Sequence, residues 1–136
     1  MNNIINTLFQ YGYHDTEITL IESFENTIIL YFNNGLYFLD ESGKETSLSS
    51  PLKIIIEINK KCNSLDYAVE IRELGKKMKY LDFKVFKSYF SKGSFGIAMA
   101  YFSNLGNTIL FDGGFENKQI LFSIESIDKL SIVFNN

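Results

Sequence analysis

Apolar side chains recur with two different periods along this chain, and two segments have the period of a helix. In residues 2–11 the apolar positions lie three and four residues apart, which is the spacing of an amphipathic helix. Residues 82–92 repeat this spacing with lysines on the opposite arc, and Asp82 and Gly93 suit the N-cap and C′ positions. The pattern therefore predicts an N-terminal helix over about 2–11 and a central amphipathic helix over about 82–92.

Most of the remaining chain alternates between apolar and polar positions, with turn residues between the runs. These runs are rich in Ile, Phe, Tyr and Val, and they predict about nine strands. Residues 66–74 fit either a strand or a helix, and the turn-like residues 75–77 favour the strand. Since most strands follow one another without a helix between them, we expect an α+β fold, mainly antiparallel β, in a single domain over residues 1–136.

The dipeptide Asn34-Gly35 is the strongest local turn signal in the chain. It separates the apolar runs 27–32 and 36–39. Both central residues of a type I′ turn need a positive φ, which Asn and Gly tolerate. The pattern predicts a hairpin in which Phe32 faces Tyr37 across the ladder.

Large and small side chains alternate in residues 94–102. With strict alternation, Phe95, Ile97, Met99 and Tyr101 share one face of a strand. The other face then carries only Gly96, Ala98 and Ala100. Because small side chains let another backbone come close, we expect a helix to pack on this second face, with residues 82–92 as the first candidate and residues 2–11 as the second.

The composition is that of a globular chain, and its rare residues exclude several kinds of site. Of 136 residues, 46% are hydrophobic and 21% are charged. The longest apolar run, 97–102, is too short to span a membrane. One histidine and one cysteine exclude two-histidine metal motifs and paired-cysteine motifs. We expect a cytoplasmic protein without a signal peptide, metal ion, cofactor or membrane contact.

The formal net charge of −3 is unevenly distributed along the chain. Residues 1–52 carry seven acidic side chains and one lysine, whereas residues 53–92 carry ten basic and five acidic side chains. Exposed acids attract basic partners and speed their encounter. We therefore expect a protein partner with a basic surface to bind the N-terminal portion. The candidate partner-binding residues are Glu22, Glu25, Asp40, Glu41 and Glu45.

Three other interpretations of the charged residues remain open. The lysines of residues 76–92, with their neighbouring tyrosines, could contact nucleic acid, but arginine occurs only once and we expect no such partner. Cys62 follows two lysines, which favour a reactive thiolate, although an incidental thiol is the simpler interpretation. Carboxylates beside apolar runs could form a catalytic pair, although outward positions explain each of them: Glu22, Glu57, Glu70 and Asp82.

The single histidine belongs to the most unusual polar cluster, residues 13–17. His14 and Asp15 could hold a metal ion or form a base oriented by a carboxylate. Adjacent side chains on a strand, however, point to opposite faces and cannot converge. The alternative is that Asp15 or Thr16 caps a turn while His14 bonds a buried backbone group.

A His-Asp turn followed by a strand and an apolar hairpin resembles small β-rich bacterial proteins of toxin–antitoxin loci, the immunity-type proteins among them. The residues that carry this resemblance are 13–18 and 26–40. The resemblance implies a binding role, and it carries over no catalytic residues. We therefore expect a non-enzymatic protein-binding module, with an immunity-type inhibitor of a bacterial toxin as its specific form. The alternative is a small-ligand-binding protein or enzyme whose cavity is lined by some of the thirteen Phe and eight Tyr residues.

Overall fold

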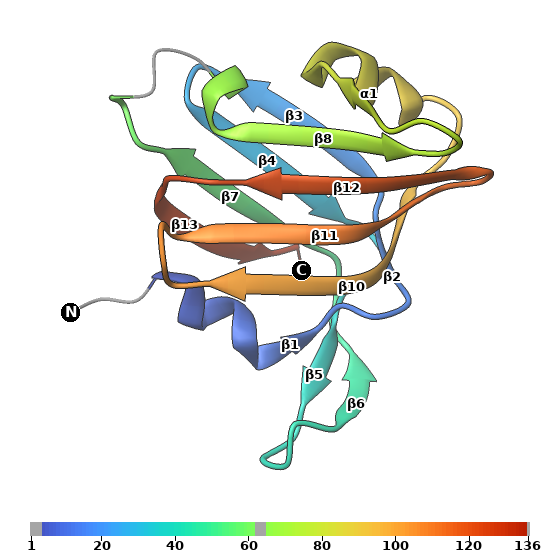
Figure 1. Cartoon of the computed structure of the whole chain (residues 1–136). Coiled ribbons are helices and arrows are strands. Elements are labelled where there is room, and N and C mark those ends of the chain that lie inside the picture. The colour runs from blue at the N-terminus through green and yellow to red at the C-terminus, as the bar shows by residue number, and fades with distance from the viewer. Residues whose placement is uncertain (1–3, 62–64, 136) are drawn as a thin grey trace.

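The computed structural model describes residues 4–61 and 65–135, which fold mainly into antiparallel β-strands (Figure 1). The helical elements are η1 (Ile4–Gln10), η2 (Leu65–Tyr67) and α1 (Phe83–Tyr89), of which η1 and η2 are 3₁₀ helices. The strands of the first half are β1 (Tyr11–Gly12), β2 (Thr16–Ile18), β3 (Leu20–Phe24), β4 (Thr27–Phe32), β5 (Tyr37–Leu39), β6 (Glu45–Leu48) and β7 (Leu52–Ile58). Those of the second half are β8 (Val69–Leu74), β9 (Lys79–Leu81), β10 (Phe95–Ser103), β11 (Thr108–Phe115), β12 (Lys118–Ile124) and β13 (Ile127–Phe134).

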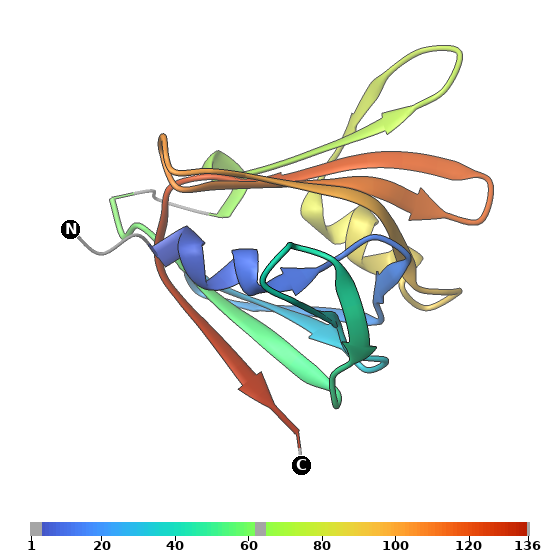
Figure 2. The same cartoon turned by 90° about the horizontal axis from the view of Figure 1, so that it is seen from below.

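Two large sheets and one small sheet make up the fold. The six-stranded sheet has the order β2-β10-β11-β12-β8-β9, and the four-stranded sheet has the order β13-β7-β4-β3. The chain passes between them at Thr19, between β2 and β3, again between β7 and β8, and at Ser126, whose φ of +56° turns β12 into β13. The two sheets meet along one side and diverge on the other (Figure 2). In the small sheet, β1-β5-β6, strand β1 lies along this body and the β5–β6 hairpin (37–48) projects from it (Figure 1). We call this hairpin the acidic arm.

The core lies between the inner faces of the two large sheets, where alternate strand residues are buried. In β7 the burial alternates strictly from Leu52 to Ile58, as the period of two requires. On the open side, α1 inserts the fully buried Phe86 against Phe95 and Phe122 of the six-stranded sheet. None of the helices in the described part of the chain could span a lipid bilayer.

The prediction of a mainly antiparallel β protein is confirmed, but the strand count and the helix details are wrong. Thirteen strands form in residues 4–61 and 65–135, because several are too short to be recognised as separate runs. The N-terminal helix is the 3₁₀ helix η1, and the asparagines at positions 2 and 3 lie outside the described residues. In the ambiguous stretch, residues 65–67 form η2 and residues 69–74 form strand β8.

The central helix begins as predicted and ends early. Asp82 is its N-cap, and its Oδ1 accepts a hydrogen bond from the Val85 N–H at 3.0 Å. Gly93 is not the C′ residue, because the helix ends at Tyr89 with Phe90 as the C-cap. Beyond that point the N–H groups of residues 90–92 bond three residues back, and these tighter turns end the α-helix.

The predicted hairpin around Asn34-Gly35 is wrong, although a turn does form there. Gly35 has a φ of +80°, and its N–H bonds to the Phe32 carbonyl at 3.0 Å. β4 is then paired on both sides by β3 and β7, so β5 cannot pair with it and joins β1 and β6 instead. The hairpin that β4 does form is with β3, through a turn in which Glu25 has a φ of +53°.

Candidate functional site

A β-bulge in β10 reverses the direction of its side chains. Ile97 pairs with Gly113 and Met99 with Asp112, which leaves Ala98 as an extra residue. Before the bulge the odd-numbered residues are buried, and after it Phe102 packs inward on Tyr13 at 5.2 Å between ring centroids. Met99 and Tyr101 consequently point outward, with 47% and 51% of their surface exposed.

The expectation of a helix over the small-residue face is therefore wrong. Gly96 and Ala98 are exposed, and Ala100 belongs to the partly buried side of the strand. Strict alternation put Met99 and Tyr101 in the core, but a one-residue insertion moves every following side chain to the opposite face. The sequence carried one signal of this, since the adjacent aromatics Tyr101 and Phe102 cannot both be accommodated by a single alternating face.

The His14–Asp15 turn holds the bulge in place. The Asp15 N–H donates to the Ile97 carbonyl at 3.0 Å, and His14 Nδ1 donates to the Ala98 carbonyl at 2.7 Å. A carbonyl only accepts, so Nδ1 must carry a proton. The turn is anchored from inside by Tyr13, whose buried hydroxyl donates to the Leu8 carbonyl at 2.9 Å.

His14 and Asp15 contact each other, which corrects the expectation that their side chains diverge. His14 Nε2 lies 3.3 Å from Asp15 Oδ2. They converge because Asp15 has a φ of +62° in a turn, a conformation that Asp tolerates and that removes strand geometry. The Thr16 hydroxyl stabilises this turn by donating to the Tyr13 carbonyl at 2.5 Å, as the turn-capping alternative proposed. The carbonyl that His14 binds belongs to an exposed residue, however, and not to a buried one.

Both ring nitrogens of His14 face acceptors, so the charged imidazolium fits the site best. The hydrogen bond to the Ala98 carbonyl, and then the charges of Asp15 and Glu45, raise the pKa of His14 above its usual value. We expect an NMR titration to give a pKa above about 6.5. Because this is the only histidine of the chain, its ring signals are assigned without ambiguity.

A raised folded-state pKa also fixes the sign of the effect on stability. The contribution of His14 is fully present below its unfolded pKa and is lost as the pH rises through the folded pKa. A His14→Gln variant should therefore lose more stability, relative to the parent, at pH 5 than at pH 9. A titration midpoint at or below about 6.5 would contradict this arrangement.

An open groove runs between the outward face of β10 and the acidic arm. It has a volume of about 640 Å³. Its apolar lining includes the exposed side chains Phe9, Met99 and Tyr101 together with Tyr11 and Leu39. We call these five residues with Glu45 the β10 groove. Among the described residues that line it there is no lysine or arginine.

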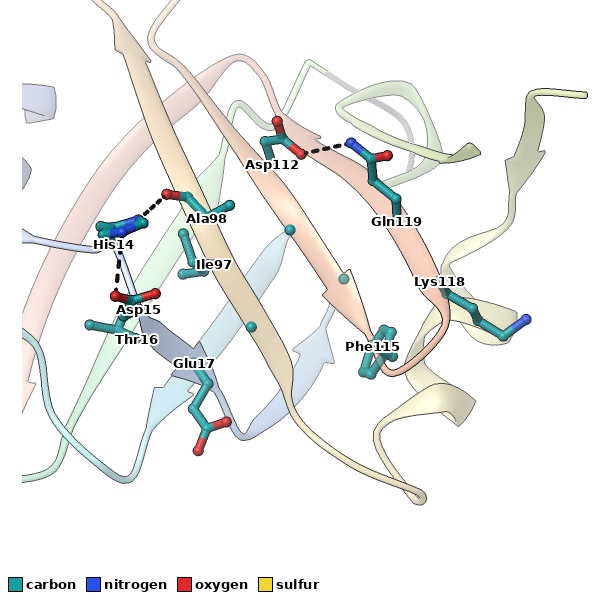
Figure 3. Close-up of a pocket in the computed structure, with 13 residues that line it drawn as sticks. His14, Asp15, Thr16, Glu17, Ile97, Ala98, Asp112, Phe115, Lys118 and Gln119 are labelled. Carbon is teal, nitrogen blue, oxygen red and sulfur yellow. Dashed lines mark hydrogen bonds and ion pairs between the residues drawn. The ribbon is translucent and has the colours of Figure 1, made fainter. Parts of the chain in front are cut away.

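A second hollow of about 610 Å³ adjoins the first at His14, which lines both. Its floor is bare backbone of β10 and β11 at Gly96, Gly113 and Gly114. Figure 3 shows His14 and Asp15 at one edge of this floor and Asp112 and Gln119 at the opposite edge. The second hollow is thus a shallow continuation of the β10 groove across the six-stranded sheet.

The five candidate acids lie in two separate places. Asp40, Glu41 and Glu45 belong to the acidic arm, with Asp40 and Glu41 in its turn and Glu45 on β6. Glu22 and Glu25 lie on β3 and in the turn after it, on the body of the molecule and apart from the arm (Figure 1). Only Glu45 lines the β10 groove.

The lysines that suggested nucleic acid lie mainly on the β8–β9 hairpin and on α1, away from the acidic arm (Figure 1). There Glu73 accepts from the Tyr89 hydroxyl at 2.9 Å and pairs with Lys79 at 3.3 Å. Burial acts to raise the pKa of Glu73, but the hydrogen bonds from Tyr89 and Lys79 and the charge of Lys118 lower it. This network ties the hairpin to α1 and to β12.

The carboxylates considered as a catalytic pair have different partners. Glu22 accepts a short hydrogen bond from Tyr31, Glu70 pairs with Arg72 at 2.9 Å, and Asp82 caps α1. Glu57 is separated from Glu22 by the intervening strand β4. Cys62 lies outside the described residues. Within residues 4–61 and 65–135, no group of three or more His, Cys, Asp or Glu side chains is arranged to hold a metal ion.

Sequence reasoning singled out the His14–Asp15 turn and the arm acids, and it missed the apolar residues between them. The β10 groove emerges only when the bulge turns Met99 and Tyr101 outward.

No protein-family model matches the chain, and no curated protein or solved structure matches it either.

Proposed function

We propose that this protein is a non-enzymatic protein-binding module whose partner presents a basic surface. The observation that carries the proposal is the β10 groove, which exposes Phe9, Met99 and Tyr101 beside the acidic arm. Isolated exposed apolar side chains are ordinary, but a contiguous group next to charged residues is typical of an interaction surface. An immunity-type inhibitor, which covers a basic toxin in the cytoplasm, is the specific form that the resemblance of residues 13–18 and 26–40 favours.

The alternative is a small-ligand-binding protein or enzyme with an aromatic cavity. A hollow of about 410 Å³ between α1 and the β11–β12 turn, lined by Tyr89, Phe115 and Lys118, is its best candidate site. Many of the aromatic side chains are not available for a cavity, because Phe86, Phe95 and Phe122 pack on one another in the core. This use of the aromatics supports the binding module over the cavity.

Charge reversal on the acidic arm tests the proposal. A partner captured from a lysate of the source organism is purified, and its association with the full chain is followed by biolayer interferometry. We expect the double variant Glu41→Lys/Glu45→Lys to slow association about tenfold at low salt, with a smaller effect in high salt, because steering between exposed charges is screened.

Asp40 is left unchanged because it holds the arm turn together. Its Oδ1 accepts hydrogen bonds from the Ser42 N–H at 2.9 Å, the Ser42 hydroxyl at 2.6 Å and the Lys44 N–H at 2.9 Å. The matched control is Glu116→Lys/Glu125→Lys, which changes the net charge equally at exposed positions outside the β10 groove. Equal slowing by the control pair, or unchanged association of the arm variant, would refute the acidic arm as the partner-binding element.

A further inference from the structure

We propose that the β10 groove binds a segment of the partner protein in which an apolar side chain is adjacent to a lysine or arginine. This inference rests on the proposed function and specifies what the partner must present. The apolar side chain would fill the space between β10 and the acidic arm, and the cation would pair with Glu45. A continuous apolar segment or an acidic segment would not satisfy both parts of the groove.

The apolar part of the groove is built on rigid elements. Phe9 packs edge-to-face on Phe102 at 5.5 Å, and Phe102 in turn packs on the buried Tyr13. Met99 and Tyr101 stand on β10, which is paired with β11 along its length. Because these side chains are held by the sheet and by η1, an apolar group entering between them loses water contact without requiring the site to fold first.

Glu45 supplies the charge at the edge of this apolar space. Its side chain lies across Gly12 of β1, where Oε2 is only 2.5 Å from the position that a Cβ of Gly12 would occupy. The carboxylate is thus brought over the groove by the absence of a side chain at Gly12. Glu45 lines the same groove as His14, and its charge adds to the rise in the pKa of that ring.

The surrounding charges favour a cationic occupant. Asp40 and Glu41 in the arm and Asp15 and Glu17 at the far side of His14 add to the negative charge around the groove. Opposing cations are few: Lys44 stands in the arm, and Lys118 lies across the glycine floor, where its Nζ is 3.8 Å from Glu73. The charge of His14 is offset by Asp15 at 3.3 Å. Complementary charge of this kind selects a basic segment over a neutral or acidic one.

The experiment is an NMR titration of the ¹⁵N-labelled full chain with blocked hexapeptides. The probe alternates Arg and Leu, and two comparison peptides alternate Glu with Leu and Arg with Ser. We expect the Arg–Leu peptide to shift the amide signals of β10 residues 99–101 and of Glu45, with at least fivefold weaker binding for each comparison peptide. Residues 99–101 and Glu45 all line the β10 groove.

Two variants separate the two parts of the groove. Met99→Ser/Tyr101→Ser should weaken binding of the Arg–Leu peptide at least fivefold at all salt concentrations, since it removes apolar contact. Glu45→Gln should weaken it about as much at low salt and less at high salt. The matched controls are Leu105→Ser, which removes an apolar side chain that is 89% exposed outside the groove, and Glu116→Gln. All these positions are on the surface, so the variants should keep the parent ¹H–¹⁵N spectrum.

Several outcomes would overturn the inference. They are shifts centred on α1 and the β8–β9 hairpin, equal binding of the Arg–Ser peptide, unchanged affinity in both groove variants, or no shift at millimolar peptide. If the groove variants also leave association with the captured partner unchanged while the arm reversal slows it, the groove inference fails and the proposed function stands. If the arm reversal has no effect either, the proposed function fails as well.

Discussion

Replacing Phe86 with alanine is expected to lower the free energy of unfolding by about 3–5 kcal/mol, the range for deleting a buried phenylalanine ring. Phe86 is fully buried, and it belongs to α1, which lies at the open side between the two sheets (Figure 2). Its ring packs on Phe95 at 5.9 Å, on Phe115 at 6.0 Å and on Phe122 at 4.8 Å between centroids. No neighbour can fill the space without leaving its own contacts, so a cavity remains.

The measurement is equilibrium unfolding in urea, followed by circular dichroism. Val85→Ala is the matched control, because Val85 lies on the same helix turn but is 40% exposed. We expect the control to change the free energy of unfolding by about 0.5 kcal/mol or less, as for other surface positions. Similar losses in the two variants would show that burial in the aromatic cluster does not determine the effect.

The second large effect is expected for Gly113→Ala, which should cost about 3 kcal/mol, the upper end for overpacking. A Cβ at Gly113 would overlap the carbonyl oxygen of Gly96 on the paired strand. Both atoms of this clash belong to backbone-fixed positions next to the bulge, so β10 and β11 must separate or the bulge must move. A changed bulge would also turn Met99 and Tyr101 away from their outward positions.

The control for this variant is Gly93→Ala, where an added Cβ would meet no atom within 4 Å. We expect its free energy of unfolding to stay within about 0.5 kcal/mol of the parent in the same urea experiment. A Gly113→Ala variant as stable as the control, with an unchanged spectrum for β10, would mean that the strands accommodate a side chain at the bulge. The expected steric clash between a Cβ at Gly113 and the Gly96 carbonyl would then be wrong.

The sequence was most informative where local chemistry determines structure. The apolar runs that predict strands, such as residues 53–58, and the N-cap Asp82 depend on local side-chain preferences and on one side-chain hydrogen bond, and both are found in the structure. The Asn34-Gly35 turn forms too, since Gly35 adopts a positive φ. The turn does not indicate which strands pair with β4. In the structure β3 and β7 occupy the two edges of β4, so no edge is left for β5.

The candidate site was less predictable because it depends on contacts between distant residues. The bulge at Ala98 is held by the turn at His14, which lies 84 residues earlier in the chain. No short window of sequence contains both elements, so residues 94–102 by themselves predict an uninterrupted alternation. The direction of the Asp15 side chain is not predictable from the sequence for a related reason, since its left-handed conformation depends on the Thr16 hydroxyl and on the hydrogen bond to the Ile97 carbonyl.

The central claim is that a partner binds over the β10 groove and the acidic arm, and hydrogen–deuterium exchange tests it most directly. Deuterium uptake of the full chain is compared alone and in complex with the purified captured partner. It is measured on proteolytic fragments that include residues 37–48, 76–92 and 96–102. We predict slower exchange in the complex for residues 37–48 and 96–102, with no change for the lysine-rich residues 76–92. Protection of residues 76–92, with 37–48 and 96–102 unchanged, would contradict the claim and place the interface at the basic end of the molecule.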